Sequence, residues 1–352
     1  MKRVKLVGAG GYGGVGLIEL LRGHPEAELS CLVDVQDTGR PVSDLYPHLA
    51  GFCDLRISAP DEPAAQEAYD VVFFATPDRV GQQLATAEWE RGARIIDYSG
   101  DFRFNTLPAY ADYAGRLGLP REHAAPDLLP EAVYGLAELH RAALTSGARL
   151  VGNPGCFAVS CILGLAPAVK EDLVEPEGLI CDCKTGVSGA GKKPHAGFHY
   201  PARYDHMNAY KLAGHQHVCE IERELGLLAG DPLQVTFTAQ VVPVCRGIMS
   251  CLYGTLRQPL KAADVLERYR SFYQESPFVR CQDRDSGLGS MHVRGTNYCN
   301  LIVDVDERTR RLRVISHIDN LVKGQAGSAL QNMNLLCGLP ETMGLDHPGQ
   351  YP

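Results

Sequence analysis

Cys156 is the residue of this chain whose setting points most directly to covalent chemistry. The segment Gly152–Ala158 reads GNPGCFA and separates the apolar run Leu150-Val151 from a second apolar run, Val159–Leu165. This order predicts a strand, a tight turn and then a helix. A thiol at a helix start faces unpaired N–H groups and the positive end of the helix dipole, and both favour the nucleophilic thiolate. We therefore expect Cys156 to be a nucleophile, and most other cysteines to be buried thiols that only pack.

A second group of reactive side chains, His215, His217 and Glu220, lies where the segment Ala213–Glu222 predicts the start of another helix. His217 and Glu220 are three residues apart and therefore share a helical face. The set could bind zinc, but the H-E-x-x-H spacing is absent, so we predict no metal. Ordinary histidines without chemistry are a further alternative. We favour a base that serves Cys156, because a thiol nucleophile needs a proton acceptor within hydrogen-bond reach.

The glycine turn Gly8–Gly13 has the G-x-G-x-x-G spacing and lies between an apolar strand, Val4–Val7, and an apolar helix, Val15–Leu21. This context favours a dinucleotide-binding loop, in which the helix N-terminus holds the pyrophosphate, over an ordinary glycine turn. Asp34 ends the second predicted strand, about 20 residues further on. At that place an acidic residue normally binds the ribose 2′-OH and repels a 2′-phosphate.

Three further features, a loop and two arginines, are candidates for holding an anion. The loop Lys184–Lys193 is rich in glycine, hydroxyl and lysine groups and offers backbone N–H groups, although it lacks the P-loop spacing and could be only a solvated loop. Arg246 opens an apolar strand, and Arg103 follows a predicted strand end. Each guanidinium could grip a carboxylate or phosphate with two parallel hydrogen bonds, or be a simple edge charge.

Composition narrows the class of protein. The chain has 352 residues, of which 45% are hydrophobic and 22% charged, as in a soluble globular protein. The net charge of −8 argues against a nucleic-acid partner. No apolar stretch is long enough for a membrane span, and no export signal precedes the first strand, so we expect a cytoplasmic protein with reduced thiols.

The strand and helix patterns predict an α/β protein with two domains. Residues 1–150 alternate buried apolar strands with helices, which indicates a Rossmann-type parallel-sheet dinucleotide-binding domain. In such sheets ligands bind beyond the carboxyl ends of the strands, where Thr76-Pro77 and Ser99–Asp101 lie. Residues 151–324 contain alternating strands and indicate an α+β catalytic and oligomerisation domain with a mixed sheet. We expect the C-terminal helix, 325–352, to pack back on the first domain.

Taken together, these motifs resemble the N-acetyl-gamma-glutamyl-phosphate reductase family, within the semialdehyde dehydrogenase-like superfamily, nearly from end to end. Besides the glycine turn, the segments that carry the resemblance are Ile96–Arg103, Tyr134–Leu139, Asn153–Cys156, Ser188–Gly191, His215–Ile221, Arg246–Ile248, Ile318–Gly327 and Gln331–Asn334.

The resemblance implies an NADPH-dependent oxidoreductase of arginine biosynthesis that reduces N-acetyl-L-glutamyl 5-phosphate to the 5-semialdehyde and phosphate. Cys156 would attack the acyl phosphate and form a thioester, which hydride from the nicotinamide then reduces. By resemblance His215 is the acid and base, while His217 and Glu220 support it or touch substrate. The spacing does not decide between the two histidines. The family also implies a homodimer or homotetramer.

The resemblance and the strand ends together assign binding residues. The residues expected to bind the cofactor are Gly8, Gly10, Gly11, Tyr12, Gly13, Asp34, Arg40, Thr76, Pro77, Ser99, Ser188, Gly189, Asn320 and Gly324. The residues expected to bind substrate are Arg103, Asn153, Lys184 and Arg246. The chain departs from the family at Asp34, where serine or arginine is common. NADP is therefore the expected cofactor, and NAD is possible.

Three other functions are kept as alternatives. The first is an aminoadipyl-phosphate reductase of lysine biosynthesis, whose substrate is one methylene longer. The second is an aspartate-semialdehyde dehydrogenase, which the His-Gln-His cluster disfavours. The third is a non-enzymatic dinucleotide-sensing regulator, which would need the glycine turn but not Cys156, His215 and Arg246.

Overall fold

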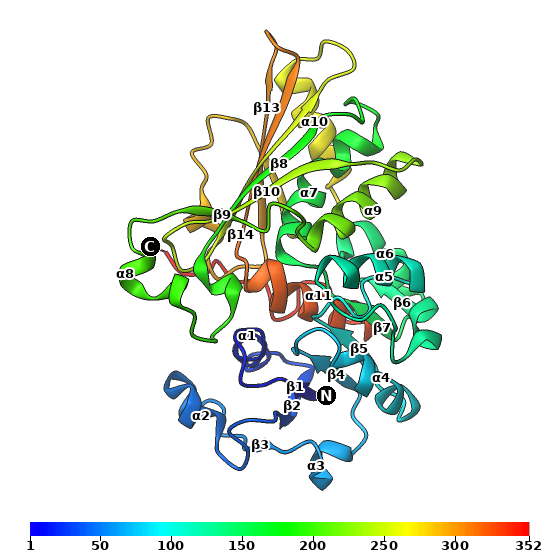
Figure 1. The fold of residues 1–352 in the computed structure, drawn as a ribbon, viewed down its shortest axis with the longest axis vertical. Coiled ribbons are helices and arrows are strands. Elements are labelled where there is room, and N and C mark those ends of the chain that lie inside the picture. Colours follow the sequence, from blue (N-terminus) through cyan, green and yellow to red (C-terminus); the bar gives the residue numbers. More distant parts are fainter. Residues whose placement is uncertain (352) are drawn as a thin grey trace. The chain divides into compact units, whose positions relative to one another are not determined.

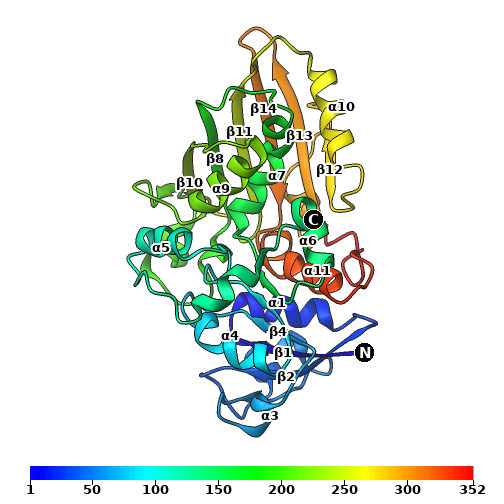
Figure 2. The same ribbon diagram turned by 90° about the vertical axis from the view of Figure 1, so that its right-hand side faces the viewer.

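The computed structural model describes residues 1–351 and divides them into two compact units (Figures 1 and 2). Unit 1 comprises Met1–Pro154 and Gln325–His347. Unit 2 comprises Gly155–Gly324 together with residues 348–351. The chain therefore leaves unit 1 in the turn that precedes Cys156. Within the described residues, no helix is long and apolar enough to cross a membrane.

Unit 1 is built on a seven-stranded sheet with the order β3-β2-β1-β4-β5-β7-β6, in which every pair of neighbours is parallel. Its strands are β1 (Lys2–Val7), β2 (Ala27–Val33), β3 (Ile57–Ser58), β4 (Val71–Phe74), β5 (Arg94–Asp97), β6 (Ala132–Tyr134) and β7 (Leu150–Gly152). Its α-helices are α1 (Tyr12–Leu21), α2 (Val42–Leu45), α3 (Pro63–Gln66), α4 (Gly81–Glu90), α5 (Leu107–Arg116), α6 (Ala137–Thr145) and α11 (Gly327–Leu336). The chain adds β2 and β3 on one side of β1 and the later strands on the other side, beginning with β4. This change of direction between β1 and β4 marks the place where such sheets bind ligands.

The local sequence explains this sheet. All four side chains of β4, Val71–Phe74, are fully buried, as expected for a strand covered by helices on both faces. The C-terminal segment belongs to the same unit, where α11 contacts α6, α1 and β5. The helix itself occupies Gly327–Leu336, a small part of the segment 325–352.

Unit 2 contains a mixed seven-stranded sheet with the order β12-β13-β14-β11-β8-β10-β9. Its strands are β8 (Leu179–Thr185), β9 (Asn208–Tyr210), β10 (Val235–Val241), β11 (Ile248–Thr255), β12 (Val279–Gln282), β13 (Cys299–Asp306) and β14 (Arg311–Ile318). Its α-helices are α7 (Cys156–Lys170), α8 (Tyr200–Arg203), α9 (His217–Ala229) and α10 (Ala262–Phe272). The pairs β8–β10 and β12–β13 are parallel, and the other pairs are antiparallel.

Three helices of unit 2, α7, α9 and α10, cover one face of its sheet. Helix α7 packs on β11 and β14, α10 packs on β13, and α9 packs on α7 and β10, which Figure 1 shows on the same side of the strands. Burial accordingly alternates along β8 and β11, with every second side chain under the helices and the others partly exposed. The predicted fold class, a Rossmann-type parallel sheet followed by a mixed sheet, is confirmed.

Candidate active site

The glycine turn of unit 1 has the shape of a dinucleotide cradle. Gly8 has a φ of +90°, and a Cβ at this position would overlap the carbonyl group of Ala75. A Cβ on Gly13 would come 2.8 Å from Nε2 of Gln325. Gly11 is the N-cap residue of α1, so the free N–H groups of the helix start lie at this turn. The backbone is thus open to a phosphate at the place where only glycine fits.

Two buried polar atoms lie at the neighbouring strand ends. Thr76 follows β4, Tyr98 follows β5, and neither hydroxyl has a hydrogen-bond partner among residues 1–351. The ring of Tyr98 lies against Gly13, with its Cδ2 atom 3.3 Å from the position of a Cβ there. Unsatisfied buried hydroxyl groups are costly unless a ligand or water completes them. The cradle and these two hydroxyl groups therefore fit a dinucleotide, and Thr76 is one of the predicted cofactor residues.

The carboxylate of Asp34 binds the backbone of the glycine turn. Its Oδ2 accepts the N–H of Gly10 at 2.9 Å, and its Oδ1 accepts the N–H groups of the next two residues at 2.8 and 3.2 Å. Arg40 lies with its guanidinium 3.3 Å from Asp37 and 3.8 Å from Asp44. Its positive charge is therefore already shared between two carboxylates of the protein, which leaves less of it for the 2′-phosphate of a cofactor.

In unit 2, Cys156 is the first residue of α7 and is partly exposed, whereas the rest of the helix as far as Val169 is buried. Gly155 is the N-cap residue, and its N–H donates to the fully buried carboxylate of Glu220 at 3.0 Å. On the other side, a Cβ on Gly324 would come 2.7 Å from the Cβ of Cys156. The turn that carries the thiol is thus held by the hydrogen bond from Gly155 to Glu220 and by the close approach of Gly324 to Cys156.

His217, the first residue of α9, is the imidazole that lies against this turn. A Cβ on Gly155 would overlap Nε2 of His217, which places the ring directly beside the residue that precedes the thiol. His215 lies next to His217, because its Nδ1 accepts the N–H of His217 at 3.1 Å and the two ring centroids are 4.7 Å apart. Burial, with a smaller contribution from the Lys211 ammonium group, lowers the pKa of His215 to about 3. His215 is therefore neutral near pH 7 and a weak base.

Arg246 belongs to a connected group in the same unit. Its guanidinium pairs with the buried carboxylate of Asp319 at 3.1 Å. The next residue, Asn320, donates from Nδ2 to the Ser188 hydroxyl at 3.0 Å and accepts the N–H of Gly247 at 2.8 Å. The amide of Asn320 therefore bridges two loops, and the predicted cofactor role of Ser188 and Asn320 stays a prediction.

Three other predicted residues have structural partners. Arg103 is buried and donates from Nε to the Asn153 carbonyl at 2.8 Å and from Nη2 to the Tyr98 carbonyl at 2.6 Å. Asn153 in turn donates from Nδ2 to the carbonyl of Gln325 at 3.0 Å. Ser99 donates its N–H and its hydroxyl to Asp97 at 2.8 and 2.9 Å. These contacts tie the strand ends of unit 1 together and favour structural roles over ligand binding.

Lys184 makes its contacts within β8, and its role as a substrate ligand stays a prediction. Its Nζ pairs with Asp182, and both side chains alternate along β8 with Cys183. Cys183 points under the helices, where its sulfur lies 3.5 Å from that of Cys161 in α7. Because neighbouring side chains of a strand face opposite ways, Lys184 lies on the sheet face away from α7.

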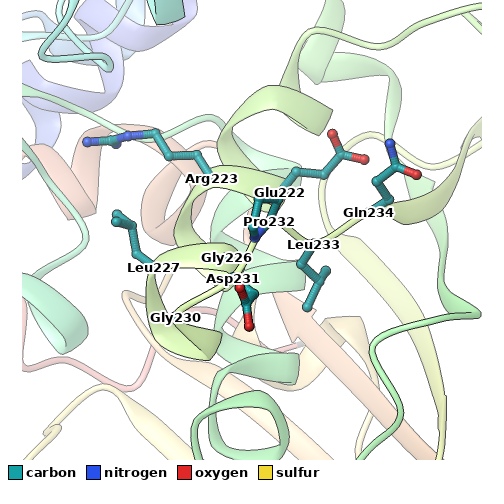
Figure 3. Close-up of a pocket in the computed structure, with 9 residues that line it drawn as sticks. All are labelled: Glu222, Arg223, Gly226, Leu227, Gly230, Asp231, Pro232, Leu233 and Gln234. Atoms are coloured by element: carbon teal, nitrogen blue, oxygen red, sulfur yellow. The ribbon is translucent and has the colours of Figure 1, made fainter.

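An open pocket of about 570 Å³ lies at the C-terminal half of α9 and contains none of the predicted site residues (Figure 3). Figure 3 shows Arg223 and Leu227 on one side of it and Glu222 and Gln234 on the other. Arg223 is already paired with Glu224 at 2.7 Å. The predicted catalytic residues of α9, His217 and Glu220, lie instead in its first turn.

Comparison with known proteins identifies the family. The chain is 44% identical to the N-acetyl-gamma-glutamyl-phosphate reductase of Citrifermentans bemidjiense, with all of both chains covered. It is 45% identical to that of Symbiobacterium thermophilum, over 99% of both chains, and 42% identical to that of Geobacter sulfurreducens, over 98% of both. The chain belongs to the N-acetyl-gamma-glutamyl-phosphate reductase family. The predicted family and its oxidoreductase class are therefore confirmed.

The domain models of the family agree with the two sheets. Residues 3–147 match the semialdehyde dehydrogenase NAD binding domain, and residues 156–320 match the semialdehyde dehydrogenase dimerisation domain. Among solved structures, an aspartate semialdehyde dehydrogenase II of Vibrio cholerae superposes with a TM-score of 0.72 at 17% identity, over 96% of this chain and 98% of that one. The enzyme of Candida albicans with NADP has a TM-score of 0.67 at 16% identity, with the same coverage. At such identities the likeness concerns the fold alone.

Two residues beside the reductase site were not among the predicted ones. Tyr210 of β9 has its ring 5.7 Å from that of His215, and burial, with a contribution from Cys156, raises the pKa of its phenol. Asp319 holds Arg246. Neither residue belongs to a motif with a known spacing. For Asp319 the available signal was its place directly after a buried strand, in a segment that resembles the family.

The contact of Gly155 with His217 leads to a testable prediction. We expect Gly155→Ala to lower kcat by about 10²-fold, because the added methyl group pushes the imidazole away from the thiol and a displacement of about 1 Å can cost this much. Steady-state kinetics and dinucleotide titration measure the effect, and dinucleotide affinity should stay unchanged. Gly23→Ala is the control, since a Cβ at Gly23 meets no atom within 4 Å. An unchanged kcat in Gly155→Ala would contradict this placement of His217.

Proposed function

We propose that this chain reduces N-acetyl-L-glutamyl 5-phosphate to N-acetyl-L-glutamate 5-semialdehyde and phosphate, through a thioester on Cys156. The observation that carries the proposal is the position of Cys156 at the start of α7, with the His217 ring against Gly155 and the Glu220 carboxylate on the Gly155 N–H. A nucleophile at the start of α7 and an imidazole and a buried carboxylate from α9 against the same turn are the parts that acyl transfer requires.

The residues then have separate tasks. His217 takes the proton of Cys156, the thiolate attacks the acyl carbon, and the C–O bond to phosphate breaks to leave the thioester. A bound nicotinamide dinucleotide supplies the hydride that reduces the thioester carbonyl. Protonated His217 gives its proton to the resulting oxygen and takes it back as the C–S bond breaks, which releases the aldehyde and the thiolate. Glu220 holds the turn on which the thiol sits, and His215 fixes the backbone N–H of His217.

Arg246 is proposed to anchor the substrate by an anionic group. Its guanidinium is about one quarter exposed, and one edge is occupied by Asp319. The opposite edge keeps donors for a carboxylate or phosphate, which a planar guanidinium can bind with two hydrogen bonds. We propose this role for Arg246, whereas the substrate roles of Arg103 and Lys184 stay predictions.

For the cofactor we propose NADPH with weak discrimination against NADH. Family resemblance supports NADPH, whereas the carboxylate of Asp34 at the glycine turn repels a 2′-phosphate, and Arg40 is already shared by Asp37 and Asp44. We expect Asp34→Ser to raise kcat/KM for NADPH relative to NADH. We expect Arg40→Ala to lower the same ratio. Binding titrations with both coenzymes provide a readout that does not depend on turnover.

An unchanged NADPH/NADH ratio in both variants would remove Asp34 and Arg40 from the ribose site. Asp34→Ser also removes the acceptor of the Gly10 N–H. A general loss of affinity for both coenzymes would therefore indicate a role in shaping the glycine turn, and only a change in the ratio indicates contact with the 2′-position.

The proposed function is tested by turnover with three acyl phosphates. N-acetylglutamyl phosphate should have the highest kcat/KM, ahead of the aminoadipyl and aspartyl compounds. One methylene group is worth about 1–3 kcal/mol in a pocket, so the preference over a neighbour in size should be about 10–200-fold. A higher kcat/KM for the aminoadipyl compound would replace the proposed substrate. Dinucleotide binding with no turnover of any of the three acyl phosphates would support the alternative of a non-enzymatic dinucleotide-sensing regulator.

We also propose that the chain works as a homodimer or homotetramer in a reducing compartment such as the cytoplasm. The match of residues 156–320 to a semialdehyde dehydrogenase dimerisation domain supports the proposed oligomer. The proposed compartment is supported by the absence of any disulfide among residues 1–351, although the chain has twelve cysteines. Light scattering on the purified protein tests the assembly.

A further inference from the structure

The Asp319 carboxylate accepts hydrogen bonds from three backbone N–H groups and pairs with Arg246. Asp319 directly follows β14 and is fully buried. Its Oδ2 accepts the N–H of Gly295 at 2.7 Å, and its Oδ1 accepts the N–H groups of Leu321 and Val322 at 2.8 and 3.2 Å. A buried charge is costly unless it is satisfied by such donors. The carboxylate is therefore fixed by the backbone before it meets any side chain.

The fixed carboxylate holds one edge of Arg246. Nε of Arg246 lies 3.1 Å from Oδ2 of Asp319, and Nη2 lies 3.2 Å from Oδ1. Nη1 has no hydrogen-bond partner among residues 1–351, and the side chain is 27% exposed. A guanidinium held on one edge presents its other edge as a rigid fork, which loses little freedom when it binds an anion.

The same residue also reaches the nucleophile through the backbone. The carbonyl of Asp319 accepts the N–H of Gly324 at 2.9 Å. Gly324 packs on Cys156, since a Cβ there would come 2.7 Å from the Cβ of Cys156. Asp319 thus contacts both the Arg246 guanidinium, through its side chain, and the glycine that packs on Cys156, through its carbonyl.

We propose that Asp319 is a positioning residue, which sets the distance between the substrate anchor Arg246 and the nucleophile Cys156. The inference rests on the proposed function, because it takes Arg246 to be the group that holds the substrate's anion. A substrate that bridges the two points reacts fast only when its acyl carbon is aligned with the thiol. Asp319 acts on the substrate through Arg246.

A double-mutant cycle on KM tests this role. We expect Asp319→Asn to raise KM for the acyl phosphate by about 10–100-fold, with a smaller fall in kcat and unchanged dinucleotide affinity. Arg246→Leu should raise KM by a similar factor. In the Arg246→Leu background, Asp319→Asn should raise KM no further, because the group through which it acts is gone. If the KM increase in the double variant equals the product of the increases in the two single variants, the proposal is overturned.

Asp304→Asn is the matched control for loss of an ion pair. Asp304 is a buried carboxylate in β13 of the same sheet and pairs with Arg313 and Arg284, which have no part in the site. We expect Asp304→Asn to leave KM unchanged. A KM increase in Asp304→Asn equal to that in Asp319→Asn would reduce the effect to a general loss of sheet stability and contradict a specific role.

Chemical rescue keeps the proposal testable if Asp319→Asn does not fold. Arg246→Ala leaves the Asp319 carboxylate facing an empty volume of guanidinium shape. Millimolar guanidinium should bind there saturably, lower KM and raise the Tm of Arg246→Ala, whereas ammonium should do neither. Absence of a saturable Tm increase would overturn the proposal. Because Tm needs no substrate, this result is independent of whether the wild type reduces N-acetylglutamyl phosphate.

Discussion

Cys156→Ser will lower turnover of the acyl phosphate by a factor on the order of 10⁴ or more, while the protein folds and binds dinucleotide as the wild type does. The hydroxyl is smaller than the thiol, so the turn between Gly155 and α7 accepts it. A serine hydroxyl at neutral pH is a far weaker nucleophile, and no thioester can form. Steady-state kinetics, circular dichroism and dinucleotide titration measure the three properties.

Cys53→Ser is the control for this result. Cys53 is a half-buried thiol of unit 1, and burial raises the pKa of its thiol, so it is not a reactive group. We expect Cys53→Ser to keep wild-type turnover. Mass spectrometry after incubation with the acyl phosphate should find the acyl group on Cys156. Turnover of Cys156→Ser near the wild-type rate would eliminate the thioester route.

His217→Asn will lower kcat by about 10²–10⁴-fold, the usual weight of a positioned acid and base. The reason is that its ring lies against Gly155, the residue that precedes the thiol. His215→Asn should cost less, about 10-fold, because the low pKa of His215 leaves it neutral and its Nδ1 already accepts the N–H of His217. The amide oxygen of an asparagine at position 215 can still accept the hydrogen bond from the N–H of His217.

The rate of alkylation of Cys156 by iodoacetamide provides the second readout for the two histidines. If His217 is the base, His217→Asn should shift the pH at which alkylation reaches half of its maximum, and His215→Asn should leave that pH nearly unchanged. A larger kcat loss in His215→Asn than in His217→Asn would move the acid and base role to His215, as the family resemblance alone suggested.

The parallel sheet of unit 1 was predictable because its central strands carry their own signal. The run Val71–Phe74 is apolar on both faces, and the glycine turn follows a strand and precedes a helix. The strands β3, β6, β9 and β12 have two to four residues each, too few for a period to be visible. They exist because the neighbouring strand offers them hydrogen bonds, which no local pattern records.

In the candidate site too, some features have a local sequence signal and others depend on tertiary packing. Cys156 was predictable from a local order of strand, turn and helix. The closeness of His217 to Gly155 depends on how α9 packs on α7, which lies beyond any spacing rule. The position of Lys184 was available from the alternation along β8, since Cys181 and Cys183 share one face and Lys184 must take the other.

The chain path through Cys156 has a consequence for how this protein is assembled from its parts. Apart from residues 348–351, unit 2 is one continuous insertion in unit 1, entered at Gly155 and left at Gly324. Gly324 packs on Cys156, and Asn153 donates a hydrogen bond to the carbonyl of Gln325, so the ends meet on both sides of the junction. Insertions whose ends lie together are the ones that a host fold tolerates. Cys156 is the second residue of the inserted unit and therefore directly follows the point at which the chain enters it.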